Sequence, residues 1–537
     1  GCSKLKSVDF SNLDASPATS MVYTFQRCTA LESINLSGLN TANVSSFEGM
    51  FDGCTALKKA DLSALNFNNV TTTAVMFRGC SALTGSINMG TKTTQASDYA
   101  VRFPATNFPK LTQIYRMYRD SGISSVNIEG IGTGGNSAMY ELVQNCPNIK
   151  SLRIKDFAAG GVDSAWMITD THLQSIYFEN VASSTTGAYR NGAGTFSGGG
   201  VINEITIKNS FNFPSYDNNQ LSNTNVISFF NETSPKVMSI DRSFNGNNRL
   251  FTEMFRSAYN QDQTGQTLTI TNSFQGTQAD RGTRYQLFNN CPYLYNVSIS
   301  HSFTAGNLEL TGMFTNCARL TNVTLDHVAT GANVSLFKFF DTVGQSISTG
   351  TKLTYTFSDF GNGGNVNLRS FMSNSFTSTG ISSDSILTWK NTGTQGTAIS
   401  MEHAFSAGWH TPEVTNRNPH WYLIDYSKGT MQGESAGDGT YALSTDLHNN
   451  MPKLDLRGMP IMGNGGSLAA SLGNDRSMSH MFENLDAAKS IGTTTGVDII
   501  LPTSLFNANV TDMACIFRSC NNLETVNLNM LGSVNNA

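Results

Sequence analysis

Aromatic residues and histidines gather in one stretch of the 537-residue chain, at Trp409, His410, His420, Trp421 and Tyr422. The histidine spacing fits no zinc-protease motif, and no carboxylate stands beside a histidine pair as a general base would. Flat aromatic rings offer large contact area at low entropic cost and can stack on sugars. We therefore predict a ligand-binding loop here, without a metal or a cofactor. Packing of these rings within the fold is the alternative, and a glycan-active enzyme near 400–425 ranks last.

A glycine-rich stretch at 130–135 has the spacing of a dinucleotide-binding fingerprint. It follows a strand pattern, precedes a helix pattern at 138–143, and is followed by Asp156 at the expected offset. However, Val126 and Leu152 stand one repeat apart, so these elements belong to a repeat, and no doubly wound sheet flanks them. We expect no dinucleotide cofactor. Since the sequence also has no nucleophile elbow and no phosphate-binding loop, we expect no enzyme.

Cysteines set the period of the chain. Six of them recur at intervals of 26 residues: Cys2, Cys28, Cys54, Cys80 and, much later, Cys291 and Cys317. Pairs of cysteines in an oxidising compartment would suggest disulfides. Yet side chains at equivalent positions of stacked repeats project in parallel, which suits a disulfide poorly, and free cysteine is among the most buried residue types. We therefore predict a column of buried, reduced thiols.

A period of this length indicates a solenoid, and each repeat contains two local patterns. Apolar residues three or four apart, such as Phe47, Met50 and Cys54, predict a short helix. The pattern around Ile34 and Leu36 predicts a short strand with one buried face. The sequence thus predicts an α/β repeat fold: a right-handed solenoid of leucine-rich-repeat type, with a parallel β-sheet on one face and short helices or irregular loops on the other.

The strand pattern recurs along the whole chain. We expect later copies at 123–128, 149–154, 173–178, 202–207, 237–240, 268–270, 294–299, 320–325, 353–357, 386–389, 421–424, 454–456, 497–500 and 523–528. Their spacing drifts between roughly 24 and 45 residues, which indicates loop insertions. We divide the solenoid into regular repeats at 1–90, irregular repeats at 91–480 and a return to regular repeats at 481–537.

The stretch from Leu36 to Ser45, followed by Met50-Phe51 and Cys54, resembles the BspA-like leucine-rich repeat family of bacterial and protist surface proteins. The resemblance is specific in 1–90, 287–326 and 478–530. It implies a secreted or surface-anchored adhesin, with ligand contact on the strand face or on inserted loops. Solenoids of this composition also suit an appendage of a phage or another virion.

Charged residues make up only 14% of the chain, against roughly 25% in an average soluble domain. A net charge of −5 gives no basic field for nucleic acid, and no apolar run is long enough to span a bilayer. Because Gly1 stands in mid-repeat, we expect an upstream cap outside this sequence. These observations favour neither nucleic-acid binding nor membrane insertion.

The resulting expectation is an extracellular or surface-exposed adhesion protein that recognises a host protein or glycan through the solenoid face and inserted loops. The alternative is a structural subunit of a self-assembling filament, sheath or virion appendage. That alternative rests on apolar end coils without an obvious polar cap, which a second subunit could cover.

Overall fold

The computed structural model folds into two compact units, residues 1–266 with 272–274 and residues 267–271 with 275–537. The residues that the structure describes are 1–10, 13–90, 99–104, 108–132, 137–157, 162–169, 172–183, 194–212, 229–246, 253–276, 282–283, 286–304, 306–331, 333–362, 365–372, 375, 381–382, 384–392, 397–401, 404–405, 424–425, 430–431, 453–462, 477–478, 481–483, 485, 488–503, 505, 510–518 and 520–528. Each unit is described below by itself.

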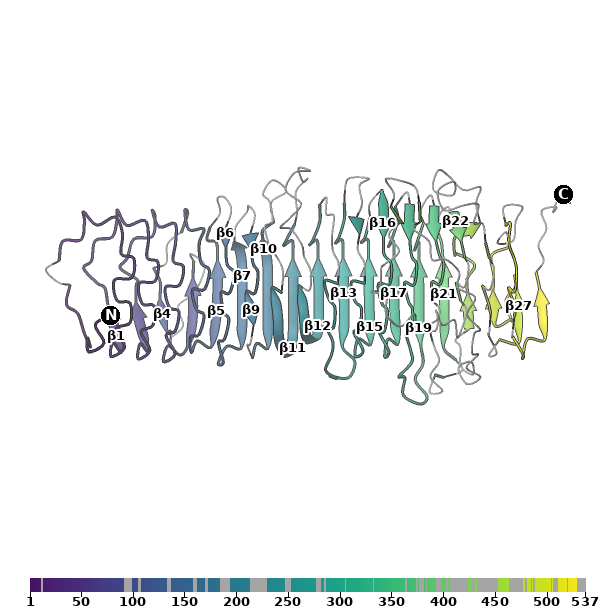
Figure 1. The fold of residues 1–537 in the computed structure, drawn as a ribbon, viewed down its shortest axis with the longest axis horizontal. Coiled ribbons are helices and arrows are strands. Elements are labelled where there is room, and N and C mark those ends of the chain that lie inside the picture. The colour runs from purple at the N-terminus through teal and green to yellow at the C-terminus, as the bar shows by residue number, and fades with distance from the viewer. Residues whose placement is uncertain are drawn as a thin grey trace. The chain divides into compact units, whose positions relative to one another are not determined.

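Unit 1 contains a ladder of parallel strands in which every coil, meaning one turn of the repeat, contributes one strand (Figure 1). In spatial order the strands are β1 (Ser33–Asn35), β2 (Lys59–Asp61), β4 (Val101–Arg102), β3 (Ser86–Met89), β5 (Ser125–Glu129), β7 (Ser151–Phe157), β10 (Ser175–Val181), β11 (Phe196–Lys208) and β12 (Phe230–Asp241). Short strands accompany them: β6 (Ser137–Ala138) pairs with β8 (Val162–Asp163), and β9 (Ile168–Thr169) pairs with β11.

Unit 2 has the same construction. Its main parallel ladder comprises β13 (Thr267–Thr271), β15 (Asn296–Ser300), β17 (Asn322–Asp326), β19 (Thr354–Ser358), β21 (Ile386–Lys390), β25 (Lys453–Asp455), β28 (Ile499–Ile500), β27 (Ser490–Gly492) and β29 (Thr525–Asn527). A second parallel ladder comprises β14 (Gly282–Thr283), β16 (Asn307–Glu309), β18 (Asn333–Ser335), β20 (Asn365–Asn367), β22 (Thr397–Ser400) and β26 (Ile461–Met462).

The prediction of a repeat stack with a parallel sheet is confirmed in each unit. Every expected strand segment except 421–424 overlaps a strand of these ladders. Buried and outward side chains alternate in strands such as β13 and β17, whereas the three residues of β29 are all exposed. At the exception, Ile424–Asp425 (β23) instead pairs antiparallel with Thr430–Met431 (β24). The apolar-polar alternation of these strands follows from one face packing on the coil interior while the other meets solvent.

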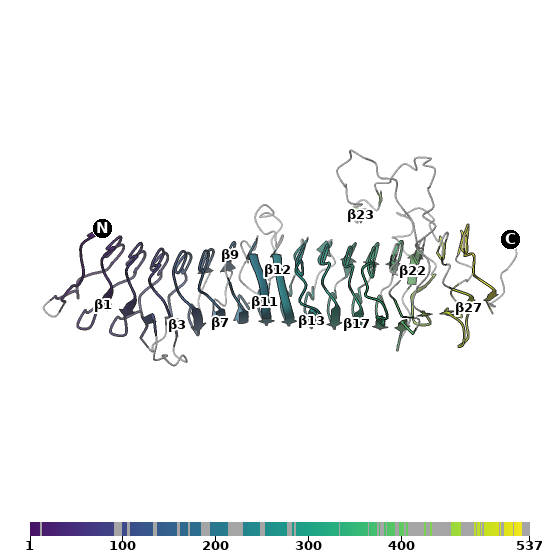
Figure 2. The ribbon, with the colours of Figure 1, turned by 90° about the horizontal axis from the view of Figure 1, so that it is seen from below.

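The prediction of short helices is wrong for the described residues, where turns take their place (Figure 2). Among these residues there is also no helix that could cross a membrane. In the coil at 47–57, Gly49 and Gly53 both have positive φ, which a right-handed helix excludes. The amides of Gly49, Phe51 and Gly53 donate to carbonyl groups of the next coil. The helix expected at 138–143 is also absent: the segment contains the end of β6 and then a turn from residue 140, with a positive φ at Glu141.

The spacing between coils explains why helices are excluded. The rings of Phe25, Phe51 and Phe77 occupy equivalent places in three successive coils, with centroid separations of 5.5 and 5.4 Å. The turn side of these coils thus repeats at nearly the same pitch as the strands, which leaves no room for α-helices that are each about 10 Å wide with their side chains. Two successive turns point every third or fourth side chain into the coil interior, as a helix would, and this produces the observed spacing of Phe47, Met50 and Cys54.

A crossover near an end of each unit departs from the simple stack. Val101 of β4 pairs with both Ala60 of β2 and Ile87 of β3, so β4 fits between two strands that precede it in sequence. In unit 2, Ile499 of β28 fits between β25 and β27 in the same way. The regular stretch predicted for 1–90 therefore incorporates a strand from beyond its boundary. The domain boundaries at 90 and 480 remain predictions.

Buried aromatic rings and thiols contribute to the core of the coils. The predicted column of buried, reduced thiols is confirmed for Cys28, Cys54, Cys80, Cys291 and Cys317, which form no disulfide, but is wrong for Cys2, which is exposed in the first coil. The Cys54 thiol donates a hydrogen bond to the Phe25 carbonyl at 3.0 Å, and Cys317 donates to the Phe288 carbonyl at 3.2 Å. Burial raises the pKa of Cys54 to about 11. The Cys54 thiol therefore remains protonated near neutral pH. Both hydrogen bonds connect one coil to the preceding one.

Candidate binding surface

The residues expected to form the ligand-binding loop, Trp409, His410, His420, Trp421 and Tyr422, lie outside the described residues. Their role as a ligand-binding loop therefore stays a prediction. The described part of the chain offers other outward aromatic and polar surfaces, two in unit 1 and one in unit 2.

The first surface lies on the turn side of unit 1. Tyr115 and Tyr140 occupy equivalent places on successive coils, and their rings stack with centroids 4.6 Å apart. The Arg116 guanidinium lies 5.4 Å from the centre of the Tyr140 ring, within the range of a cation–π contact. Glu141 donates its amide to the Ala165 carbonyl, which places Trp166 beside it on the next coil. We call Tyr115, Arg116, Tyr140, Glu141 and Trp166 the turn-face patch.

Trp166 is the most exposed aromatic residue in this patch, with half of its surface open to solvent. It lies over Gly194, where an added Cβ would stand 2.7 Å from the indole ring. Tyr23 covers Gly49 in the same manner at the other end of the unit. Because Gly194 has no side chain, the Trp166 ring packs directly on its backbone while half of the residue stays exposed.

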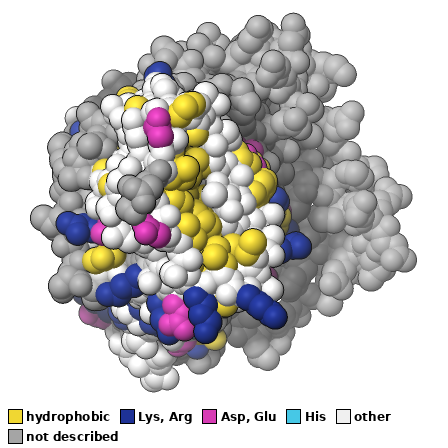
Figure 3. Space-filling model, turned by 90° about the vertical axis from the view of Figure 1, so that its left-hand side faces the viewer, with side chains coloured by type: hydrophobic (Ala, Val, Ile, Leu, Met, Phe, Trp, Pro, Cys, Tyr) yellow, Lys and Arg dark blue, Asp and Glu magenta, His cyan; other side chains and the backbone are white. Residues whose placement is uncertain are grey.

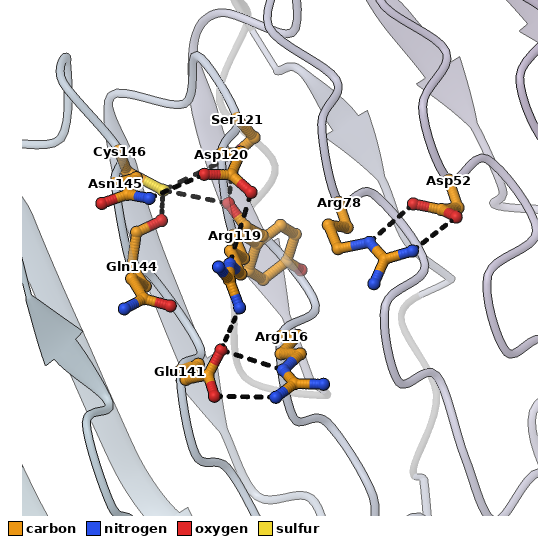
Figure 4. Close-up of polar contacts among 11 residues, drawn as sticks. Asp52, Arg78, Arg116, Arg119, Asp120, Ser121, Glu141, Gln144, Asn145 and Cys146 are labelled. Atoms are coloured by element: carbon orange, nitrogen blue, oxygen red, sulfur yellow. Dashed lines mark hydrogen bonds and ion pairs between the residues drawn. The ribbon is translucent and has the colours of Figure 1, made fainter.

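Ion pairs fix the polar members of the patch (Figure 4). Both oxygens of Glu141 accept hydrogen bonds from Arg116, at 2.8 and 2.9 Å, and Arg119 contacts the same carboxylate. An equivalent fork joins Arg78 to Asp52 two coils away, at 2.8 Å for both contacts. Forked guanidinium–carboxylate pairs restrict both partners, so Arg116 is held in place beneath the aromatic rings.

The Glu141 pair predicts a pH-dependent stability. The hydrogen bond from Arg116 lowers the pKa of Glu141, burial opposes this effect, and the charges of Arg116 and Arg119 lower the pKa further. The unfolded carboxyl, with a pKa near 4.3, therefore binds a proton before the folded one does. We expect Glu141→Gln to cost about 1–2 kcal/mol at pH 7 in urea unfolding, because the guanidinium groups keep partial contact with water. The difference should shrink from about pH 4.5 downward.

A difference between wild type and Glu141→Gln that stayed constant from pH 7 to pH 3 would contradict this assignment. Glu32→Gln is the matched control, because its pair with Lys58 is exposed on both sides and should leave stability nearly unchanged.

The second surface lies on the strand side of unit 1. The Tyr177 ring is flanked by Arg153 at 5.4 Å and Lys208 at 5.7 Å, both within cation–π range. Its hydroxyl donates to Glu179 at 2.7 Å. Burial and that carboxylate raise the pKa of Tyr177 to about 12, so the phenol remains neutral. Arg153 is also paired with Glu129 at 3.0 Å. The result is an aromatic ring surrounded by charges that already have partners.

The strand side of unit 2 is different, because hydroxyl groups dominate it. One column of outward residues runs in register through five strands: Thr269, Ser298, Thr324, Thr356 and Thr388. The neighbouring column contains Asn296 and Asn322, joined by a side-chain hydrogen bond of 2.7 Å. Thr, Ser and Asn side chains thus make up this hydroxyl face.

Comparison with known proteins gives one partial match. A family model described as "Mycoplasma protein of unknown function, DUF285" matches residues 1–115. No curated protein and no solved structure matches the chain.

Proposed function

We propose that this chain is a binding protein of the adhesin type, secreted or exposed on a surface, that recognises a glycan or protein through its solenoid faces and inserted loops. The turn-face patch supports the proposal most directly, because it combines the half-exposed Trp166 with the stacked pair Tyr115 and Tyr140. In this proposal the coils are right-handed and of leucine-rich-repeat type, as the BspA-like resemblance implies.

The chemistry of the patch favours a glycan over a protein. A sugar ring presents an apolar face of C–H groups that stacks on a flat aromatic side chain, while its hydroxyls need polar partners at the rim. Trp166 supplies such a platform, and Arg116 and Glu141 supply a donor and an acceptor nearby. No large apolar pocket is needed for this mode of binding, and the rigid stack keeps the platform preorganised.

A glycan array and an array of host surface proteins test the proposal with the same purified chain. We expect glycan binding, and we expect Trp166→Asn to weaken it at least tenfold because the aromatic platform is removed. Asparagine is chosen because it tolerates the positive φ at this position. Tyr23→Asn is the matched control, because Tyr23 also covers a glycine at positive φ but lies far along the ladder from the patch. Binding that Trp409→Ala and Trp421→Ala abolish, while Trp166→Asn does not, would move the site to the predicted loop.

Self-association is the second candidate function. Figure 3 looks at the end of unit 1 that carries β1 and shows hydrophobic side chains gathered there. Leu13, Val22 and Tyr23 are among the exposed large hydrophobic residues of that region. Contiguous exposed apolar surface commonly marks an interaction site. Light scattering of the purified polypeptide over a range of concentrations tests this function, which requires assemblies larger than a monomer.

A further inference from the structure

Two histidines one repeat apart meet at a corner of unit 2, directly after strands β15 and β17. His301 donates its amide to the Asp326 carbonyl at 2.9 Å, and His327 donates to the Ser358 carbonyl at 2.9 Å. These bonds place His301, His327 and Asp359 side by side on successive coils. All three have φ near +50°, a conformation in which aspartate and histidine are enriched.

Nitrogen and oxygen donors converge at this corner. The rings of His301 and His327 stack with centroids 4.7 Å apart. A carboxylate oxygen of Asp326 lies 2.9 Å from Nδ1 of His327. His301, Asp326 and His327 each offer one ligand atom, and these three atoms lie within 4.8 Å of one another. Asp359 stands on the other side, with its Oδ2 atom 3.5 Å from Nε2 of His327. Two carboxylates therefore face two imidazoles.

Asp359 is the rigid part of the corner. Its side chain is almost fully buried, and it accepts hydrogen bonds from the Thr392 amide at 2.7 Å and the Thr392 hydroxyl at 2.6 Å. Asp359 thus provides a fixed carboxylate beside His327. Both histidine side chains are exposed to solvent.

We propose that His301, Asp326 and His327 bind a first-row divalent metal ion of the zinc type. Imidazole nitrogen and carboxylate oxygen are ligands that zinc prefers, at bond lengths of about 2.0–2.2 Å, whereas magnesium and calcium prefer oxygen alone. Small rotations of the two exposed rings bring their nitrogens from the stacked arrangement to a common ion. Asp359 then acts as the carboxylate that orients a metal-bound histidine. Three protein ligands on an exposed corner leave a coordination position for water or a donor from a bound partner.

Zinc protection of histidine side chains from diethyl pyrocarbonate, quantified peptide by peptide, tests the proposal at these residues. We expect Zn²⁺ and Ni²⁺ to protect His301 and His327 together, over one concentration range, whereas Mg²⁺ and Ca²⁺ protect neither. His301→Asn should weaken the protection of His327 at least tenfold. Asparagine suits the backbone here, since Asn272 stands at the corresponding place after β13 with φ of +49°.

Two controls keep the result interpretable. His172→Asn removes another exposed histidine of the described residues and should change nothing at the corner. Circular dichroism of each variant checks that the fold is retained. Absence of zinc protection in the folded wild type would overturn the proposal, as would zinc protection of His327 that is unchanged by His301→Asn.

Discussion

Gly90→Ala should lower the stability of unit 1 by about 2–6 kcal/mol, measured by urea unfolding. Gly90 follows β3, has φ of +122°, and packs so closely on β5 that an added Cβ would stand 1.7 Å from the Glu129 carbonyl oxygen. Two costs add up. The backbone conformation is one that residues with a side chain rarely adopt, at about 1–3 kcal/mol, and the neighbouring strand must move to relieve the clash, at about 1–3 kcal/mol.

Gly38→Ala separates the two costs. Gly38 also has positive φ, at +88°, but an added Cβ there meets nothing within 4 Å. Only the conformational term remains, which we expect to be about 1–2 kcal/mol. Equal losses for the two variants would show that the close approach of β3 and β5 contributes nothing, contrary to the packing described here.

The strand half of each repeat could be predicted from sequence because its signal is local. Alternation such as Val323 and Leu325 inside with Thr324 outside is set by the two-residue period of a strand, whatever coil precedes it. The cysteine column could also be predicted, because a spacing of 26 residues is the length of one coil. Both inferences depend on single repeats and need no knowledge of how distant segments meet.

The helix predicted for the other half of each repeat was wrong because the packing of neighbouring coils overrides the local apolar pattern. Phe47, Met50 and Cys54 are all buried and have helical spacing, yet the coil pitch leaves no space for a helix. The signal against a helix was present in Gly49 and Gly53, four residues apart, which are the positions with positive φ. The inserted strand β4 was missed because its two residues carry too little pattern.

The surfaces proposed as sites were missed for another reason. Trp166 occupies a position of the repeat where some other coils have polar residues. Its ring packs on Gly194 of the next coil, and no local sequence pattern predicts that contact. His301 and His327 lie outside the aromatic stretch at 409–422 on which the predicted site was based. Their separation equals the period of the cysteines Cys291 and Cys317, and that coincidence is the signal that could have placed them together.

Phe314→Ala should destabilise unit 2 by about 3–5 kcal/mol. The Phe314 ring is fully buried and stacked between Phe288 at 5.2 Å and Phe340 at 5.4 Å. Its removal leaves a cavity lined by two rings that the hydrogen-bonded backbone on either side prevents from closing up, so the loss includes a cavity term. Urea unfolding followed by circular dichroism measures the change.

Phe337→Ala provides the comparison with the same substitution one coil further on. Phe337 is only half-buried, and its carbonyl, which accepts a hydrogen bond from Gly312 at 2.9 Å, is unaffected by the change. We expect a smaller loss than for Phe314→Ala, because this ring stays partly in water and its removal leaves no closed cavity. In a stack where each coil is covered only by its neighbours, the cavity at Phe314 should also speed amide exchange in β15 and β17, while β21 exchanges as before. Uniformly faster exchange through all strands of unit 2 would show instead that the coils open as one body, and the nearest-neighbour account of this fold would then be wrong.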